Sequence, residues 1–335
     1  MLTRQMATKS SGEVTRVHWR RPAATVLCLL VAIGATAHFK RTGQLPFLHR
    51  ANVWSIAVYE GPSPFELTAG PGNQPILTAR DVSDVPAMFV ADPFMVQDGD
   101  TWYMFIEVFN KNTRQGDIGL ATSHDDGLTW KYDEIVLDES FHMSYPSVFR
   151  WQHKWYMLPE SHEAGQIRLY EALAFPRRWR HVHTCIVGER LADPTLFRHD
   201  DRWWMFVGRS HTHDRLQLFY ADELFGKWTE HSQSPLIETD PHTARPGGPV
   251  VRVDDQLYRF GQDCSPKYGQ QLRAFRISKL TTTEYVEEPL EFGPVLTAGS
   301  TAWNANGMHH CDPHLLPNGR WRAAVDGHYK KWVLE

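Results

Sequence analysis

The chain has 335 residues, of which 42% are hydrophobic and 12% aromatic, which is enough apolar material for a large buried core. The formal net charge of −4 provides no basic surface of the kind that binds nucleic acid, so no nucleic-acid partner is expected. Four cysteines are too few for a disulfide framework. We expect free thiols, with a single Cys264–Cys311 bridge as the alternative.

The N-terminal region has the pattern of a targeting segment. Residues 1–21 are polar and basic, and residues 22–39 are almost entirely apolar. The apolar run is at the lower length limit for a membrane-spanning helix, and the basic residues before it predict a cytoplasmic tail. Ala35-Thr36-Ala37 fits a signal-peptidase site, so a cleaved signal is the alternative to a single-pass anchor. Either case places the rest of the chain outside the cytoplasm, after a linker at 40–53.

A proline followed by an aromatic strand recurs along the rest of the chain. The clearest copy runs from Asp92-Pro93 to Trp102-Tyr103-Met104-Phe105, and the later copies are centred on Pro146, Pro194, Pro246 and Pro313. The first four prolines are about 50 residues apart, and self-similarity at such a period is typical of a radial or stacked repeat.

The distribution of strands predicts how the repeat closes. Each of the first four repeats contains four short strands, and the repeats start near Phe94, Ser147, Thr195 and Pro249. The last repeat starts at Asp312 and has only its first two strands, whereas residues 54–77 supply a third and a fourth. The two ends therefore complete one blade together, which leaves no long unpaired sheet edge. We predict an all-β, five-bladed β-propeller over residues 54–335.

In such a propeller the first strand of each blade begins, and the second ends, at the same mouth of the central channel. The first strands begin at Asp92, Tyr145, Asp193, Arg245 and Asp312. The second strands end at Glu107, Glu160, Arg209, Asp263 and Asp326. Polar groups confined to one rim of an otherwise apolar ring predict a binding site there, to which His162 and His310 would add.

Two interpretations of these carboxylates stay open. An aspartate before proline is a common turn residue that can cap backbone N–H groups, and Arg245 could simply form a buried ion pair. Alternatively, paired carboxylates are what glycosidic cleavage requires, and crowding raises the pKa of one of them so that it stays protonated near neutral pH. We therefore take Asp92, Asp193 and Glu160 as catalytic candidates, and the other mouth residues as substrate-binding candidates.

The segment from His309 to His314 is rich in metal-ligand residue types. Adjacent residues on a strand point to opposite faces, so these side chains cannot all reach one ion. A metal held by His310 or His309 with Asp312 is the minor alternative. We expect rim histidines that contact substrate hydroxyls, and no metal or other cofactor.

Several stretches resemble known propellers. Ala192-Asp193-Pro194-Thr195-Leu196-Phe197 is similar to the Asp-Pro strand of family 43 glycoside hydrolases, in the arabinanase, levansucrase and invertase superfamily. More closely, the chain resembles the N-terminal domain of plant glucosamine inositolphosphorylceramide transferase and its bacterial relatives. That resemblance rests on Phe89-Val90-Ala91-Asp92-Pro93-Phe94-Met95, Ile118-Gly119-Leu120-Ala121-Thr122-Ser123, Ser144-Tyr145-Pro146, Ala244-Arg245-Pro246 and Gln262-Asp263-Cys264.

The resemblance implies a carbohydrate-directed domain, with two departures. The plant enzyme carries glycosyl transfer in a separate C-terminal domain, which we do not expect in this chain. The hydrolases place their acid glutamate at an inner-strand start, where this chain has none, so Glu160 is assigned as acid and Glu107 as the next choice. By resemblance Asp92 would be base or nucleophile, and Asp193 the transition-state stabiliser.

The resulting hypothesis is a propeller that hydrolyses or transglycosylates a glycan or glycolipid head group outside the cytoplasm. The alternative is a carbohydrate-binding module without chemistry that assists a separate glycosyltransferase.

Overall fold

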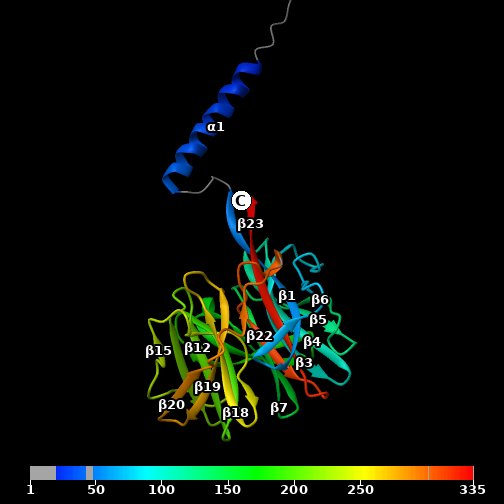
Figure 1. Ribbon diagram of the computed structural model, residues 1–335, viewed down its shortest axis with the longest axis vertical. Helices are drawn as coiled ribbons and strands as arrows, with labels where there is room; N and C mark the ends of the chain where they lie inside the picture. The colour runs from blue at the N-terminus through cyan, green and yellow to red at the C-terminus, as the bar shows by residue number, and fades with distance from the viewer. Residues whose placement is uncertain (1–19, 43–47, 301, 335) are drawn as a thin grey trace, which may run out of the picture. The chain divides into compact units, whose positions relative to one another are not determined.

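The structure is a computed structural model that describes residues 20–42, 48–300 and 302–334. Their strands form five antiparallel sheets, which are the blades of a β-propeller (Figure 1). Blade one consists of β3 (Ala87–Asp98), β4 (Thr101–Asn110), β5 (Gln115–Ser123) and β6 (Lys131–Leu137). Blade two consists of β7 (Ser144–Trp151), β8 (Lys154–Glu160), β9 (Gln166–Ala174) and β10 (Arg178–Val187), with the short helix η1 (His162–Ala164) after β8.

The remaining blades follow the same order with shorter or interrupted strands. Blade three contains β11 (Leu191–His199), β12 (Arg202–Arg209), β13 (Arg215–Ala221), β14 (Thr229–Glu230) and β15 (Ile237–Glu238). Blade four contains β16 (Arg245–Pro246), β17 (Val251–Val253), β18 (Gln256–Asp263), β19 (Gln271–Leu280), β20 (Tyr285–Pro289) and β21 (Leu296–Thr297). Blade five contains β22 (Cys311–Leu315), β23 (Trp321–Leu334), β1 (Leu48–Ser63) and β2 (Glu66–Ala69), and η2 (Ala302–Asn304) precedes it.

Blade five confirms the predicted closure. Its strand order is β2-β1-β23-β22, so the N-terminal strands supply the third and fourth positions, and Figure 1 shows blue β1 beside red β23. An isolated bridge between Ile56 and Leu77 ties in the segment after β2. Because β1 pairs with the last strand, the sheet edge that an open ring would expose is covered.

The core lies between neighbouring blades. Leu158 and Leu169 of blade two pack against Met205 and Val207 of blade three, and all four are fully buried. Each sheet is therefore covered on both faces. This explains why the second strands have continuous apolar sequences rather than an alternation of apolar and polar residues. Burying each such side chain contributes about 1.5–3 kcal/mol.

A shared irregularity turns the first strands of three blades toward the mouth. The register of β3 shifts between Ala91 and Phe94, and β7 and β11 shift at the equivalent positions. In each bulge the residue before the proline is left-handed, with φ of +49° at Asp92, +50° at Tyr145 and +48° at Asp193. Such backbone is rare for non-glycine residues, and a bulge of this kind re-aims a side chain next to a site.

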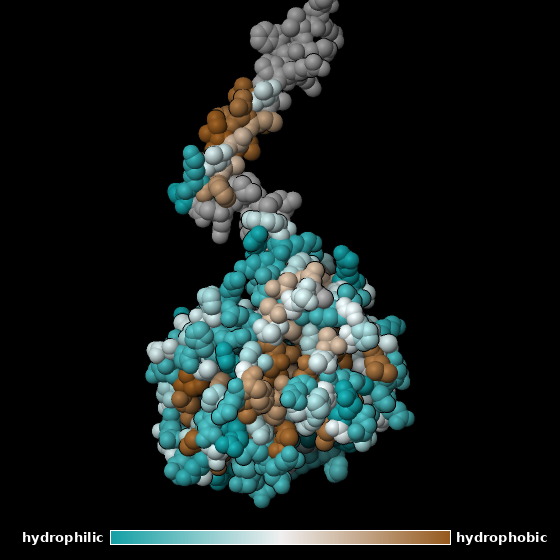
Figure 2. Space-filling model, viewed as in Figure 1, coloured by the Kyte–Doolittle hydropathy of each residue, from teal (hydrophilic) through white to brown (hydrophobic). Residues whose placement is uncertain are grey.

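The predicted N-terminal apolar segment is helical but its extent differs from expectation. Helix α1 spans Arg20–Thr42, and β1 begins at Leu48, so the linker expected at 40–53 is shorter. Apolar side chains along α1 are exposed, as the brown atoms in Figure 2 show. Among the described residues, no helix combines the length and apolar character that crossing a membrane requires. Residues 1–19 of the predicted basic tail lie outside the described residues.

The cysteines are free, as the composition predicted. Cys264 and Cys311 are buried without a bridge between them, Cys185 is half-buried, and Cys28 on α1 is exposed.

Candidate functional site at the propeller mouth

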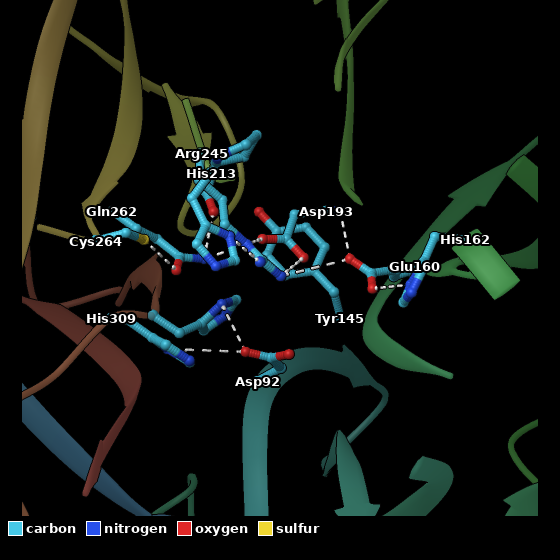
Figure 3. Close-up of polar contacts among 12 residues, drawn as sticks. Asp92, Tyr145, Glu160, His162, Asp193, His213, Arg245, Gln262, Cys264 and His309 are labelled. Carbon is cyan, nitrogen blue, oxygen red and sulfur yellow. Dashed lines mark hydrogen bonds and ion pairs between the residues drawn. The ribbon is translucent and has the colours of Figure 1, made fainter. Parts of the chain in front are cut away.

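A cavity of about 210 Å³ opens where the first strands begin and the second strands end. Five of the residues predicted for the mouth line it: Asp92, Glu107, Glu160, His162 and Arg245. The other lining residues are Trp54, Phe89, Ala91, His142, Ser144, Ser210, Tyr268 and His309. Figure 3 shows the polar contacts of this region.

Asp193 and Arg245 form the central ion pair of the site. Arg245 Nε donates to Asp193 Oδ2 at 2.5 Å and Nη2 donates to Oδ1 at 3.1 Å, a bidentate pairing across the start of blades three and four. Gln262 Nε2 adds a third hydrogen bond to the same carboxylate at 3.0 Å. Burial, with Glu160 nearby, raises the pKa of Asp193 to about 7, although Arg245 opposes this.

Glu160 is held as a carboxylate. Its Oε1 lies 2.7 Å from His162 Nδ1, and its Oε2 accepts the backbone N–H of Asp193 at 2.9 Å. Arg245 Nη2 lies 3.6 Å from Oε2. Burial alone would raise the pKa of Glu160, but the His162 hydrogen bond and the Arg245 charge outweigh burial and lower the pKa well below its usual range. A lowered pKa favours the ionised form of Glu160, and the role of Glu160 as the acid stays a prediction.

Asp92 and Glu107 have the opposite character. The two are neighbours in blade one, since Ala91 pairs with Glu107 across β3 and β4. Burial raises the pKa of Glu107 well above its usual range, and the charges of Glu160 and Asp326 add to this. Burial, Glu107 and Asp326 likewise raise the pKa of Asp92. Of the carboxyl groups that line the cavity, Asp92 and Glu107 are the two whose pKa is raised.

Asp326 lies beneath Asp92 and fixes the backbone around it. Its Oδ2 accepts the backbone N–H of Asp92 at 3.1 Å, and its Oδ1 accepts that of His310 at 3.1 Å. His309 Nδ1 lies 2.9 Å from the same Oδ1. Burial would raise the pKa of Asp326, but the neighbouring histidines and these N–H groups outweigh it and lower the pKa.

An aromatic sandwich forms the wall beside Asp326. The ring of Trp54, from β1, stacks on His309 at a centroid distance of 3.9 Å and lies 4.2 Å from His328. Tyr268 meets His309 edge-on at 5.3 Å. The strand that closes the propeller therefore also supplies a wall of the cavity.

One group of residues could hold a metal ion. Ligand atoms of Asp92, His309 and Asp326 lie within 4.8 Å of one another, and all three residues are buried. The sequence suggested, as a minor alternative, a metal held by His310 or His309 with Asp312. In the structure Asp312 instead accepts the backbone N–H of Met95 at 2.5 Å and contacts His314 Nε2 at 2.9 Å. Asp312 is thus placed inside blade five, away from the cavity.

Six further predicted residues do not line the cavity: Asp193 and Asp326, whose contacts are given above, and Tyr145, His310, Asp263 and Arg209. Tyr145 lies deeper in the channel, where its hydroxyl bonds Thr195 at 2.8 Å and the backbone of Gly248. His310 is fully buried beside Phe94, and burial lowers its pKa to about 4.

Asp263 and Arg209 complete this group. Asp263 is buried, and its carboxylate is engaged by His242 Nδ1 at 2.9 Å and Gln271 Nε2 at 2.7 Å. Arg209, at the end of β12, is half-buried and lies outside the cavity lining. Both residues lie at strand ends as expected, and the side chain of Asp263 bonds partners other than a cavity ligand.

Several cavity residues were missed from the sequence. Trp54, Tyr268 and His142 line the cavity, and His213 contacts Arg245 Nη1 through its Nδ1 at 2.7 Å, whereas His309, which also lines the cavity, was considered from the sequence. Gly269, next to Tyr268, permits the close packing of this wall. Its φ is +66°, and a Cβ on it would lie 2.5 Å from Trp54 and 2.9 Å from His309, so only glycine permits this close approach.

Comparison with known proteins identifies the family. The model described as "Glucosamine inositolphosphorylceramide transferase 1, N-terminal" matches residues 49–328. The chain belongs to this family. It is 38% identical over 296 residues to glucosamine inositolphosphorylceramide transferase 1 of Oryza sativa subsp. japonica, covering 82% of this chain and 40% of that protein. The Arabidopsis thaliana protein of the same name is 36% identical over 297 residues, covering 82% and 39%. The chain thus spans about 40% of the length of the curated relatives it matches.

Solved structures share the fold at low sequence identity. The catalytic domain of a Coprinopsis cinerea family 62 α-L-arabinofuranosidase superposes with a TM-score of 0.55 at 14% identity, covering 85% of this chain and 98% of that one. An exo-1,5-α-L-arabinanase from a bovine ruminal metagenomic library gives 0.53 at 12%, covering 73% and 94%. These similarities establish the propeller fold of the family member described here.

Proposed function

We propose that the mouth binds a glycosyl head group and cleaves or transfers its glycosidic bond. The observation that carries this proposal is the pair Asp92 and Glu107, two buried carboxyl groups with raised pKa in one small cavity. Glycosidic cleavage needs one carboxylic acid to protonate the leaving oxygen and one carboxylate to act as base or nucleophile. Two interacting carboxyl groups can supply both forms. Once one of them ionises, its negative charge keeps the other protonated.

The surroundings assign a role to each member of the pair. His309 Nδ1 and His310 Nδ1 lie 3.9 and 4.0 Å from Asp92 Oδ1, so the ionised form of Asp92 has cationic or dipolar partners. Glu107 has only His142 Nε2 at 3.6 Å, and burial lowers the pKa of that histidine. We assign Glu107 as the acid in place of Glu160, and Asp92 as base or nucleophile. The ion pair of Asp193 and Arg245 stabilises charge near the anomeric centre of the sugar.

The cavity also limits the substrate class. Its volume of about 210 Å³ is below the ~300–1,000 Å³ of typical ligand pockets, so it accommodates one sugar ring rather than a chain. Carboxyl groups outnumber the single arginine at the mouth, which favours a sugar that carries an amino group over an anionic one. The name of the plant relatives, which refers to glucosamine and an inositolphosphorylceramide, agrees with a glycolipid head group of this kind.

Product analysis tests the proposal. The purified chain is incubated with aryl glycosides, glucosaminides included, and with a glycosylated inositol phosphorylceramide, and products are followed by NMR and mass spectrometry. Turnover by the wild type should fall roughly 10²–10⁴-fold in Glu107→Gln. Asp222→Asn, a surface change on blade three, is the matched control and should retain activity.

The alternative function is glycan binding without turnover, as a module that assists a separate glycosyltransferase. The observation that favours it is the engagement of Glu160 and Asp193 by Arg245, which neutralises two of the three predicted catalytic groups. Saturable binding at the mouth with no product from any glycoside would select this alternative. In that case Glu107→Gln should change affinity only.

We also propose that the domain works outside the cytoplasm. The support is the basic segment 1–21 followed by the apolar segment 22–39. Expression of the full chain, followed by cell fractionation and mass spectrometry of the N-terminus, separates a cleaved signal from a retained segment. An intact N-terminus in the soluble cytoplasmic fraction would contradict the proposal.

A further inference from the structure

A second, larger cavity lies on the face of the propeller opposite the mouth. It has a volume of about 520 Å³ and is formed by blade one and the β9–β10 hairpin of blade two. Thr101 begins β4 at this cavity, whereas Glu107 of the same strand reaches the mouth. At ~3.3 Å per strand residue the two sites are roughly 20 Å apart. The larger cavity, here called the blade-one groove, is thus separate from the proposed catalytic mouth.

Two aromatic rings line the groove, and both are held in place. Trp130 Nε1 donates to the carbonyl of Gly127 at 2.9 Å. Tyr103 meets Phe175 edge-on at 5.0 Å, and Phe175 is itself stacked on Trp155 at 4.3 Å. Both lining rings are half-buried, so part of each surface remains open to the groove. Rigid, partly exposed aromatic rings supply contact area at low entropic cost.

The polar lining is balanced in charge and rich in hydroxyl groups. Arg177 bonds Asp133 at 3.0 Å and Glu134 at 2.6 Å, so its charge is matched from within the protein. Asp125 is occupied by Thr129, whose hydroxyl and backbone N–H hold the pKa of Asp125 at about 2. The lining carries two basic residues, Lys131 and Arg177, and two acidic ones, Asp125 and Asp133, so it has no excess of either sign to select an anion or a cation.

We propose that the blade-one groove binds a neutral saccharide chain. Threonine hydroxyls, aromatic faces and internally paired charges fit a ligand with many hydroxyl groups and no net charge. The volume falls within the ~300–1,000 Å³ range of ligand sites, and the opening suits a chain of sugar rings rather than the single ring of the mouth. The groove holds its ligand without chemistry, since its lining carboxylates are ion-paired or capped by hydroxyl groups.

Native affinity electrophoresis in gels that contain soluble xylan, arabinan or galactan tests the groove directly. The wild-type chain should be retarded by at least one of these neutral polysaccharides. Thr122→Arg places a long side chain into the groove and should weaken the retardation by about tenfold or more. Thr229→Arg, the same substitution at an exposed strand position on blade three, is the control and should behave as wild type.

Two further variants separate the possible outcomes. Tyr103→Leu removes one ring and should also weaken retardation, so the test does not depend on the folding of a single variant. Glu107→Gln changes only the mouth and should leave retardation intact. The groove proposal would be overturned if Thr122→Arg and Tyr103→Leu were both fully retarded, or if the wild type were retarded in no gel. It would also be overturned if only Glu107→Gln lost retardation. None of these outcomes bears on turnover at the mouth, which is measured separately.

Discussion

Glu160 Oε2 accepts the backbone N–H of Asp193 at 2.9 Å, which joins the end of the second strand of blade two to the start of blade three. Asp326 Oδ2 does the same for the backbone N–H of Asp92 at 3.1 Å, across the closure between blades five and one. Both acceptors have pKa values lowered by neighbouring donors and histidines against the effect of burial. These two carboxylates therefore link adjacent blades at the bulges of β3 and β11.

Glu160→Gln should destabilise the protein, because it removes the charge that faces His162 and Arg245 in a buried setting. We expect a loss of roughly 1–3 kcal/mol in the free energy of unfolding, measured by denaturant titration. Asp222→Asn breaks an exposed ion pair with Arg202 and should cost about 0–1 kcal/mol. Equal effects of the two substitutions would contradict the role of Glu160 as a joint between blades.

Glu107 and Glu160 should make the free energy of unfolding depend on pH in opposite directions. The folded-state pKa of Glu107 is raised, so above the ordinary value of 4.5 the native state keeps a proton that the unfolded state has lost. Its contribution is present below that value and is lost as the pH rises through the folded-state pKa. The pKa of Glu160 is lowered, so its contribution is present above 4.5 and is lost on acidification.

Thermal unfolding across a pH series checks this sign. The melting temperature of Glu107→Gln should fall less than that of the wild type as the pH rises from 4.5 toward neutrality. The deficit of Glu160→Gln should be largest near neutral pH and shrink in acid. Parallel curves for the wild type and Glu107→Gln would show that Glu107 has no raised pKa.

Trp54→Ala should disturb the mouth as well as the closure of the propeller, because this ring packs between His309 and His328. Truncating a buried tryptophan costs about 3–5 kcal/mol. Trp54→Phe keeps a ring in the sandwich and should lose less than half as much stability. If the alanine variant unfolds, the phenylalanine variant still reports through weaker binding of a head-group sugar. Unchanged binding in a folded Trp54→Ala would remove this residue from the site.

The four thiols should react at different rates with a thiol reagent. Cys28 is exposed, whereas burial raises the pKa of Cys264 to about 11 and that of Cys311 well above its usual range. Since the thiolate is the reactive form, Cys28 should react first and the buried pair only after unfolding. Counting released chromophore before and after denaturation checks this. A total of two thiols in the denatured protein would indicate a Cys264–Cys311 bridge.

The fold could be predicted from the sequence because the repeat records blade boundaries and the strand count requires closure. Pro93, Pro146 and Pro194 mark three bulges, and residues 54–77 supply the missing strands, as the structure confirms. The roles within the site could not be predicted in the same way. The pKa of Glu160 depends on Arg245, two blades further along the chain, and on His162. Trp54 becomes a wall of the cavity only because β1 closes the ring beside His309.

The central claim is that Glu107 protonates the leaving group at the mouth, and leaving-group dependence tests it most directly. Turnover by the wild type and by Glu107→Gln is compared on a nitrophenyl glycoside, whose leaving group needs no proton, and on an alkyl glycoside of the same sugar. Glu107→Gln should lose roughly 10²–10⁴-fold in turnover of the alkyl glycoside and much less in turnover of the nitrophenyl glycoside. Equal losses on both substrates, or no turnover of either by the wild type, would contradict it.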